Sequence, residues 1–349
     1  MTGMQQSAVD WTVLESWLKD KGIAAGPIED IAPIGGGTQN LMFSFVCDGK
    51  RFVLRRGPVH LRSTTNEAMR REAKVLAALA DTPVPKPRLV AAETDENVLG
   101  AVFYLMEPVE GFNASVGLPE LHSSDENLRR QMGFQVVDAL AALGSVDPSE
   151  VGLDDFGHPE GFLDRQVPQW LRMLDKYAEL DGYDGHQLPE VDSLAEWLTA
   201  NKPDEFKPGI MHGDFHLANL MFRNDGPEVA AIVDWEMSTV GDPLLDLGWL
   251  LATWPSADVA ASATSGALGH LGGLPTRTEI VRYYATVADR PVDNALWYTV
   301  MASFKLAVIL EGTHARACAG KAPKPVGDFL HSMAVALLTQ AQRFTEEGF

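Results

Sequence analysis

The chain has 349 residues, which at roughly 100 to 200 residues per domain indicates about two globular units. Hydrophobic residues make up 46% and charged residues 22%, values near those of ordinary globular proteins, so composition excludes a disordered or fibrous chain. The formal net charge of -20 argues against a surface that binds nucleic acid or anionic lipid. A solvated acidic surface and a preference for cationic substrates both remain compatible with this charge.

Two cysteines, Cys47 and Cys318, are too few for a disulfide framework and lack the paired spacing of a zinc site. The first residues lack the basic and apolar regions of a signal peptide. Asp246 and Lys305 interrupt the apolar runs before these reach the length of a membrane span. We therefore expect a cytoplasmic protein with a small-molecule partner, with no nucleic-acid or membrane partner, and with no indication of its oligomeric state.

The N-terminal third predicts a helix followed by strands. Asp10 precedes an apolar stripe at helical spacing that ends near Gly22, as in a capped amphipathic helix. The short apolar runs 31–34, 41–46 and 51–55 are separated by glycine turns, which is typical of antiparallel strands.

A second helix follows these strands. Thr64 and Glu67 match a capping box, and the helix that they open places Glu72 inside a stripe of apolar residues. Prolines end this helix, and residues 99–106 read as a further strand.

The stretch 107–111 has the composition of a connector, and we place the lobe boundary there. Residues 1–108 are then the nucleotide-binding lobe, and residues 109–349 are a lobe that holds the catalytic loop, the metal site and the acceptor site. Apolar residues recur at near-helical spacing in the second lobe. The expected fold class is therefore α+β, with a small antiparallel sheet in the first lobe and a mainly helical second lobe.

One part of the second lobe departs from the helical pattern. Apolar runs at 219–222 and 229–233 flank the turn sequence Asn-Asp-Gly-Pro, which predicts a β-hairpin. The loop before it reads HGDFHLAN, and its second strand leads into IVDWE. A rigid hairpin can bring polar side chains of such loops to one place, here Asp214, Asn219 and Asp234.

Carboxylate and amide oxygens suit Mg²⁺, which also takes substrate phosphates as ligands. We expect Asn219 and Asp234 to hold this metal and Asp214 to act as a general base toward an attacking hydroxyl. His212 and His216 flank Asp214 and leave a zinc hydrolase as an alternative, although their spacing is not that of HExxH.

HGDFHLAN, IVDWE and GDPLLDLGW together resemble the catalytic and metal loops of the aminoglycoside phosphotransferase and choline kinase superfamily. The resemblance implies a protein-kinase-like two-lobe fold and an ATP- and Mg²⁺-dependent small-molecule kinase that phosphorylates an alcohol group. It gives Asp214 the role of catalytic base and Asn219 and Asp234 that of magnesium ligands. A nucleotide-binding pseudokinase that transfers nothing is the alternative of a different class.

FVLRR, REAKVLAAL and GDPLLDLGW are similar to the phosphotransferase domains found fused to acyl-CoA dehydrogenases. That subgroup is associated with hydroxyacyl-CoA compounds, whereas the best-known family members modify aminoglycosides or choline. The acceptor therefore stays open.

Kinases of this type also need a glycine-rich phosphate loop, a basic residue on a following strand and a helical glutamate. An ionised Glu72 in an apolar stripe independently calls for a cationic partner. Arg55 stands where many kinases have lysine, and the sequence leaves open whether Arg55 or Arg56 faces the phosphates. The resemblance places nucleotide-binding roles at Gly35, Gly36, Gly37, Thr38, Arg55, Glu72, Glu107 and Val109.

Asp242 and Asp246 follow the IVDWE segment. Asp242 precedes a proline, which is a common pair at a helix start, so both carboxylates can be structural as well as functional.

Overall fold

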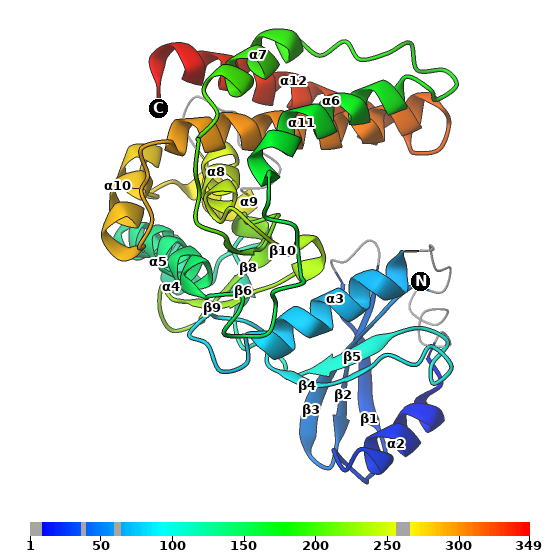
Figure 1. The fold of residues 1–349 in the computed structure, drawn as a ribbon. Helices are drawn as coiled ribbons and strands as arrows, with labels where there is room; N and C mark the ends of the chain where they lie inside the picture. Colours follow the sequence, from blue (N-terminus) through cyan, green and yellow to red (C-terminus); the bar gives the residue numbers. More distant parts are fainter. Residues whose placement is uncertain (1–8, 36–39, 59–63, 256–265) are drawn as a thin grey trace. The chain divides into compact units, whose positions relative to one another are not determined.

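The computed structural model describes residues 9–35, 40–58, 64–255 and 266–349 (Figure 1). The chain divides into two compact units. The first unit consists of Met1–Gly111 and Ala230–Ser238, and the second of Phe112–Val229 and Thr239–Phe349. A segment from late in the chain, which includes the predicted ligand Asp234, thus belongs to the N-terminal unit.

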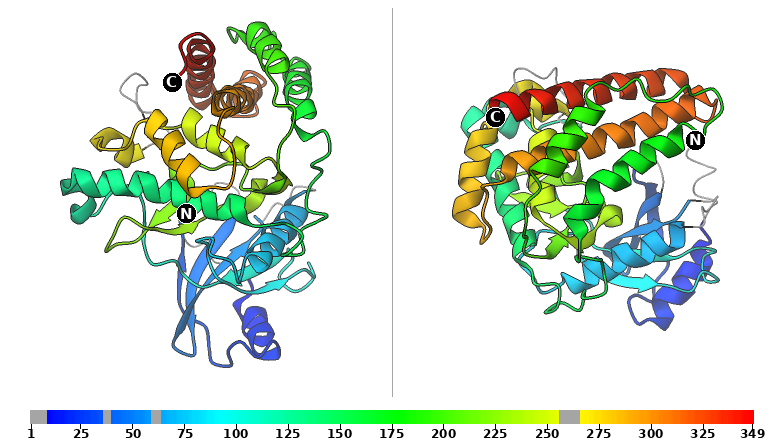
Figure 2. Two further views of the ribbon diagram at one scale, coloured as in Figure 1. Left: turned by 60° about the vertical axis from the view of Figure 1, so that its left-hand side comes forward. Right: turned by 45° about the horizontal axis from the view of Figure 1, so that its top comes forward.

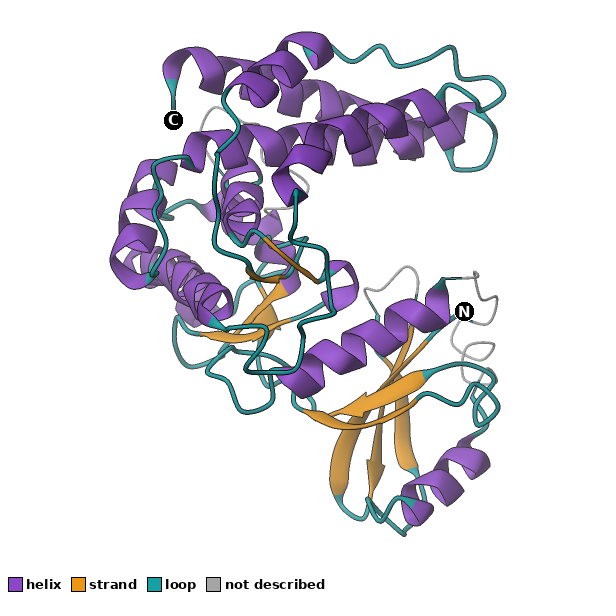
Figure 3. Ribbon diagram, viewed as in Figure 1, coloured by secondary structure: helices purple, strands orange, loops and turns teal. Residues whose placement is uncertain are grey.

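An antiparallel sheet forms the centre of the first unit (Figure 3). Its order is β1-β2-β3-β5-β4, where the strands are β1 (Glu29–Pro33), β2 (Leu41–Cys47), β3 (Lys50–Arg56), β4 (Leu89–Glu93) and β5 (Phe103–Met106). Asp48 and Gly49 join β2 to β3 with positive φ angles of 50° and 70°, which suit a tight hairpin turn. The predicted strand at 99–106 is confirmed only from Phe103, and β4 was not predicted.

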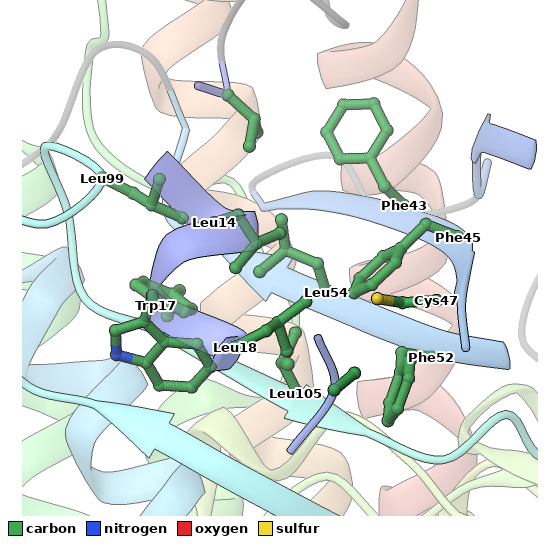
Figure 4. Close-up of a cluster of buried hydrophobic side chains, with 13 residues drawn as sticks. Leu14, Trp17, Leu18, Phe43, Phe45, Cys47, Phe52, Leu54, Leu99 and Leu105 are labelled. Atoms are coloured by element: carbon green, nitrogen blue, oxygen red, sulfur yellow. The ribbon is translucent and has the colours of Figure 1, made fainter. Parts of the chain in front are cut away.

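Two helices cover opposite faces of this sheet. In α2 (Trp11–Asp20), the Asp10 carboxylate accepts hydrogen bonds from two first-turn amides at 3.1 Å, so the predicted capped helix is confirmed. Leu14, Trp17 and Leu18 of α2 pack in one apolar cluster with Leu54 and other residues of the sheet (Figure 4).

Helix α3 (Thr65–Ala78) lies on the other face of the sheet. Arg55 points away from the Leu54 face and contacts Glu72 of this helix. The capping box predicted at Thr64 is wrong. The Thr64 backbone already has helical angles, φ -99° and ψ -5°, and its hydroxyl makes no capping hydrogen bond. The Thr64 carbonyl still accepts the amide of Ala68, so the helix begins without a side-chain cap.

Helices dominate the second unit, which confirms the α+β fold class. They are α4 (Glu120–Ser124), α5 (Glu126–Ser145), α6 (Phe162–Tyr177), α7 (Val191–Ala200), α8 (Leu244–Ala252), α9 (Gly266–Leu271), α10 (Arg277–Val287), α11 (Ala295–Cys318) and α12 (Lys324–Glu347). The long helices α11 and α12 run antiparallel, side by side (Figure 2). By length and composition α11 could cross a membrane, but 72% of its apolar stretch is buried within the protein, as in the core helix of a globular fold.

Short strands support the loops of the second unit. β7 (Gly209–Met211) pairs with β10 (Thr239–Gly241), and β6 (Phe112–Asn113) pairs with β8 (Leu220–Phe222). The predicted turn between β8 and β9 (Val229–Ile232) is present, because the amide of Arg223 donates to the carbonyl of Glu228 at 3.0 Å.

Candidate active site

The predicted catalytic loop connects β7 to β8 in the second unit. Asp214 and Asn219 lie together, since the Asn219 amide Nδ2 donates to the Asp214 carbonyl at 2.9 Å and to its carboxylate Oδ2 at 3.0 Å. Nε2 of His216 lies 3.3 Å from the other carboxylate oxygen, Oδ1. The short helical turn η1 (Leu217–Asn219) closes the loop, and His216 Nδ1 accepts the amide of Ala218 at its start.

These contacts determine the charge of Asp214. Burial alone would raise the pKa of its carboxyl, but the hydrogen bond and charge of His216, the charge of His212 and the Asn219 hydrogen bond outweigh burial and lower it to about 2. Asp214 is therefore a carboxylate at neutral pH. So acidic a group is a weak base, but its carboxylate can accept a hydrogen bond.

Asp246 of α8 fixes the backbone of this loop. Its two carboxylate oxygens accept the amides of His212 at 2.6 Å and Gly213 at 2.8 Å, and the residue is only 1% exposed. Burial raises the pKa of Asp246 to about 7, against the effect of these hydrogen bonds and of the Lys305 charge. Asp242 accepts the amide of Leu244 at the start of α8, at 3.1 Å. The structure thus gives both carboxylates a bracing role.

Lys305 of α11 approaches the same loop from the helical core. Its ammonium Nζ donates to the carbonyl of Gly213 at 3.3 Å and lies 4.6 Å from the ring centroid of Trp249. Burial lowers the pKa of Lys305, and the charges of Asp246 and Asp214 oppose this effect. The ammonium of Lys305 thus offsets part of the negative charge of Asp246 on α8 and of Asp214 in the loop.

The predicted pair of Arg55 and Glu72 is present in the first unit. Nη2 of Arg55 lies 2.9 Å from Glu72 Oε1 and 2.7 Å from Asp234 Oδ1, and the Tyr104 hydroxyl donates to Glu72 Oε2 at 2.8 Å. Asp234 has a positive φ of 69°, an uncommon backbone conformation for a residue other than glycine. Arg56 instead donates to the carbonyl of Leu99 at 2.7 and 3.1 Å, so Arg55 is the arginine that reaches the acidic pair.

Burial shifts the pKa values of the groups in this network. Burial raises the pKa of Glu72, and the charge of Arg55 opposes that rise. Burial alone would lower the pKa of Arg55, but its acidic neighbours outweigh burial and raise it, so the guanidinium stays charged. Tyr104 stays protonated because burial and the Glu72 charge both raise its pKa. The glutamate thus accepts two hydrogen bonds from donors that keep their protons.

Of the other predicted nucleotide-binding residues, the structure describes Gly35, Glu107 and Val109. Gly35 is exposed just beyond β1, and Gly36, Gly37 and Thr38 lie outside the described residues. Glu107, on the exit from β5, is exposed and forms an ion pair with Arg88 at 2.8 Å, and Val109 is half-buried. Their roles stay predictions.

Asn219 of the second unit and Asp234 of the first each have an oxygen atom that can bind a cation. Nδ2 of Asn219 is committed to Asp214, which leaves its amide oxygen as the atom that can bind a cation. The Asp234 side chain is 40% exposed, and one of its oxygens, Oδ1, contacts Arg55. Both residues offer the hard oxygen donors that Mg²⁺ prefers.

The histidines of the loop do not favour a zinc site. In the described part of the chain, two groups place metal-binding atoms within 4.8 Å of one another: Glu72 with Asp234 and Glu236, and Glu311 with His314 and His331. His212 belongs to neither group, and its Nδ1 accepts the Asp214 amide at 3.3 Å.

Sequence reasoning missed Tyr104 and the role of Lys305. A tyrosine in a fully buried strand carries no sequence signal of its hydroxyl partner. Lys305 did carry one, because a single lysine in a long apolar helix must find a carboxylate or carbonyl when the helix is buried.

Residues 30–280 match the model of a family described as the phosphotransferase enzyme family. Among curated proteins, mouse acyl-CoA dehydrogenase family member 10 is 29% identical over 98% of this chain, which covers 32% of that relative. Human acyl-CoA dehydrogenase family member 11 is 30% identical over 82% of this chain, which covers 36% of it. The chain thus spans about a third of the length of these relatives.

Solved structures show the same fold. A protein from Ralstonia eutropha, described as a candidate aminoglycoside phosphotransferase, is 30% identical with a TM-score of 0.77, over 96% of this chain and 99% of that one. An aminoglycoside phosphotransferase in a ternary complex with ADP and hygromycin B is 15% identical with a TM-score of 0.58, over 93% and 98% of the two chains.

Proposed function

The chain belongs to the phosphotransferase enzyme family, and we propose that it transfers the γ-phosphate of ATP to a hydroxyl group of a small molecule. The observation that carries this proposal is the state of Asp214. Asn219 and His216 hold it as a carboxylate, in a loop whose backbone is fixed by Asp246. A fixed acceptor of this kind suits a reaction in which positioning and charge neutralisation supply most of the rate.

In the proposed reaction the acceptor hydroxyl donates a hydrogen bond to Asp214 and attacks the γ-phosphorus. A new bond forms between the hydroxyl oxygen and phosphorus, the bond between the γ-phosphorus and its bridging oxygen breaks, and ADP leaves. Because the pKa of Asp214 is about 2, we place proton transfer to its carboxylate late, when the hydroxyl oxygen has already become acidic by bonding to phosphorus.

Asn219 and Asp234 are the residues that we propose to hold Mg²⁺. The metal, when bound, neutralises charge on the phosphate oxygens. Arg55 already contacts Asp234 and Glu72, so its guanidinium is oriented before any nucleotide binds. We propose that one edge of this guanidinium turns to the inner phosphates of ATP.

For the acceptor we propose the hydroxyl of a hydroxyacyl-CoA as the first candidate. The similarity to acyl-CoA dehydrogenase family members 10 and 11 supports this choice. Aminoglycosides and amino alcohols are the second candidates, supported by the fold shared with aminoglycoside phosphotransferases.

A combined binding and transfer experiment tests the proposal. Calorimetric titration with ATP and Mg²⁺ is followed by an acceptor screen that measures ADP release and the phosphorylated product by mass spectrometry. We expect nucleotide binding and turnover with at least one acceptor class. In Asp214→Asn, which keeps the size of the side chain, turnover should fall by about 10²- to 10⁴-fold while ATP affinity changes little.

Two results would count against the proposal. Nucleotide binding without turnover on any acceptor would indicate a binding module. Full turnover in Asp214→Asn would remove this carboxylate from the reaction.

A further inference from the structure

A second group of ligand-type side chains, one buried and two partly exposed, lies on α11 and α12 of the second unit, apart from the loop at 212–219. Glu311 and His314 lie one turn apart on α11, and His331 comes from α12. A carboxylate oxygen of Glu311 and one ring nitrogen of each histidine all lie within 4.8 Å of one another. From this arrangement we propose a site for Zn²⁺ or a similar late first-row cation, which would join α11 to α12.

The helices come close enough for this because of Gly327. A Cβ atom at this position of α12 would lie 2.4 Å from the Ala317 Cβ and 3.2 Å from the His314 Cα, so only glycine permits this approach. His331 follows Gly327 by four residues and therefore lies on the same face of α12, toward α11. The close contact of the helices thus brings the imidazole of His331 to Glu311.

Two polar contacts fix the orientation of the Glu311 carboxylate. It is fully buried, at 0% exposure. Its Oε1 accepts the hydroxyl of Tyr183 at 2.6 Å, and its Oε2 lies 2.7 Å from Nδ1 of His331. A carboxylate hydrogen-bonded by a second group on its far oxygen is the usual support of a metal ligand, because that bond fixes the orientation of the ligand.

His314 supplies an incompletely bonded nitrogen. Among the described residues its buried Nδ1 has no hydrogen-bond partner, and the nearest opposite charge, Asp328 Oδ1, lies 3.6 Å away. The His314 and His331 rings are 4.6 Å apart at an angle of 32°. Two imidazoles at this distance repel each other when both are protonated, whereas neutral imidazoles can bind one cation together.

The donor set selects the class of metal. Two imidazoles and one carboxylate suit Zn²⁺ and similar late first-row cations better than Mg²⁺ or Ca²⁺, which take mostly oxygen ligands. Four-coordinate sites with bond lengths of about 2.1 Å separate their ligand atoms by roughly 3.4 Å, so Glu311 Oε2 and His331 Nδ1, which lie 2.7 Å apart, must move apart slightly. The side chains of His314 and His331 are 18% and 25% exposed, which leaves the site accessible to an ion.

Cys318 is the competing explanation for any metal that binds here. Its thiol is exposed and lies 3.6 Å from Nε2 of His314. An exposed thiol beside an imidazole can bind Zn²⁺ weakly without Glu311 or His331. The test must therefore separate the three-residue site from this thiol.

The test uses the full chain, stripped of metal with a chelator. Zn²⁺ is titrated by calorimetry, and Co²⁺ is added as a spectroscopic probe. We expect about one Zn²⁺ per chain and the strong visible absorption of four-coordinate Co²⁺. Zn²⁺ at 100 times its dissociation constant should raise the melting temperature by roughly 5 °C.

The variants decide which residues bind. His331→Gln and Glu311→Gln should lose the Co²⁺ absorption and at least tenfold in Zn²⁺ affinity, while Cys318→Ser and the exposed control His270→Gln should keep both. Circular dichroism of the metal-free variants shows whether they fold. Zn²⁺ binding equal in wild type and a folded His331→Gln variant would overturn the proposal, as would loss of binding in Cys318→Ser alone.

Discussion

Replacing Glu72 by glutamine tests whether the buried network of the first unit is held together by charge. Glutamine keeps the size of the side chain but removes its charge and replaces one oxygen with an amide group. Glu72 is 0% exposed and accepts hydrogen bonds from Arg55 and Tyr104. Each hydrogen bond to a charged group contributes about 1.5 to 3 kcal/mol, and breaking a buried ion pair costs about 3 to 5 kcal/mol.

Arg55 keeps one acidic partner in this variant, because the same nitrogen also contacts Asp234 at 2.7 Å. The cost should therefore lie at the lower end of that range, about 3 kcal/mol. In a unit of this size, such a loss lowers the melting temperature by roughly 10 °C. The affinity for ATP should fall as well, because Arg55 is then oriented by Asp234 alone.

A matched control is the exposed ion pair that Arg70 of the same helix forms with Glu96, in the turn after β4. Arg70 and Glu96 make the same Nη2 to Oε1 contact at 2.8 Å, but Glu96 is 49% exposed where Glu72 is fully buried. Glu96→Gln should change stability by less than about 0.5 kcal/mol, because water screens the exposed pair.

The assay combines calorimetric melting with hydrogen exchange read by mass spectrometry, which assigns the loss of stability to peptides of the first unit. If Glu72→Gln and Glu96→Gln lower the melting temperature equally, burial does not decide the strength of these pairs, and the reasoning fails.

Two further predictions concern the second unit. Gly248→Ala should destabilise the protein by more than about 2 kcal/mol in urea unfolding, because the added Cβ would lie 2.2 Å from the carbonyl oxygen of Tyr298. The control Gly117→Ala should be near neutral, because its added Cβ would have no atom within 4 Å. Equal urea midpoints for the two variants would contradict this packing. The pKa of Asp214 is lowered to about 2 from an unfolded value near 3.9, so its carboxylate stabilises the folded state above about pH 4, and this contribution is lost as the pH falls to 2. The free energy of unfolding, measured by urea titration at pH 5 and at pH 3, should therefore fall by about 1 kcal/mol more in wild type than in Asp214→Asn. An equal fall in both proteins would show that Asp214 is not stabilised as a carboxylate.

Local sequence patterns determined most of the elements and one half of the candidate site. Asp10 and the stripe behind it predicted α2, and the turn at Asp48 and Gly49 predicted the hairpin of β2 and β3. The loop HGDFHLAN places Asp214 and Asn219 five residues apart, so its own short turn is enough to bring them into contact. These predictions are correct because the interacting groups are close in sequence and the short backbone segment between them can adopt few conformations.

Only the tertiary structure decided which distant groups meet. Arg55 contacts Asp234, 179 positions away, and Arg56 turns to a backbone carbonyl; both are buried, so alternation along β3 could not by itself distinguish them. The bracing of the loop by Asp246 and the meeting of His331 with Glu311 depend likewise on helix packing. A sequence shows that a buried charge needs a partner, but packing over long separations selects that partner.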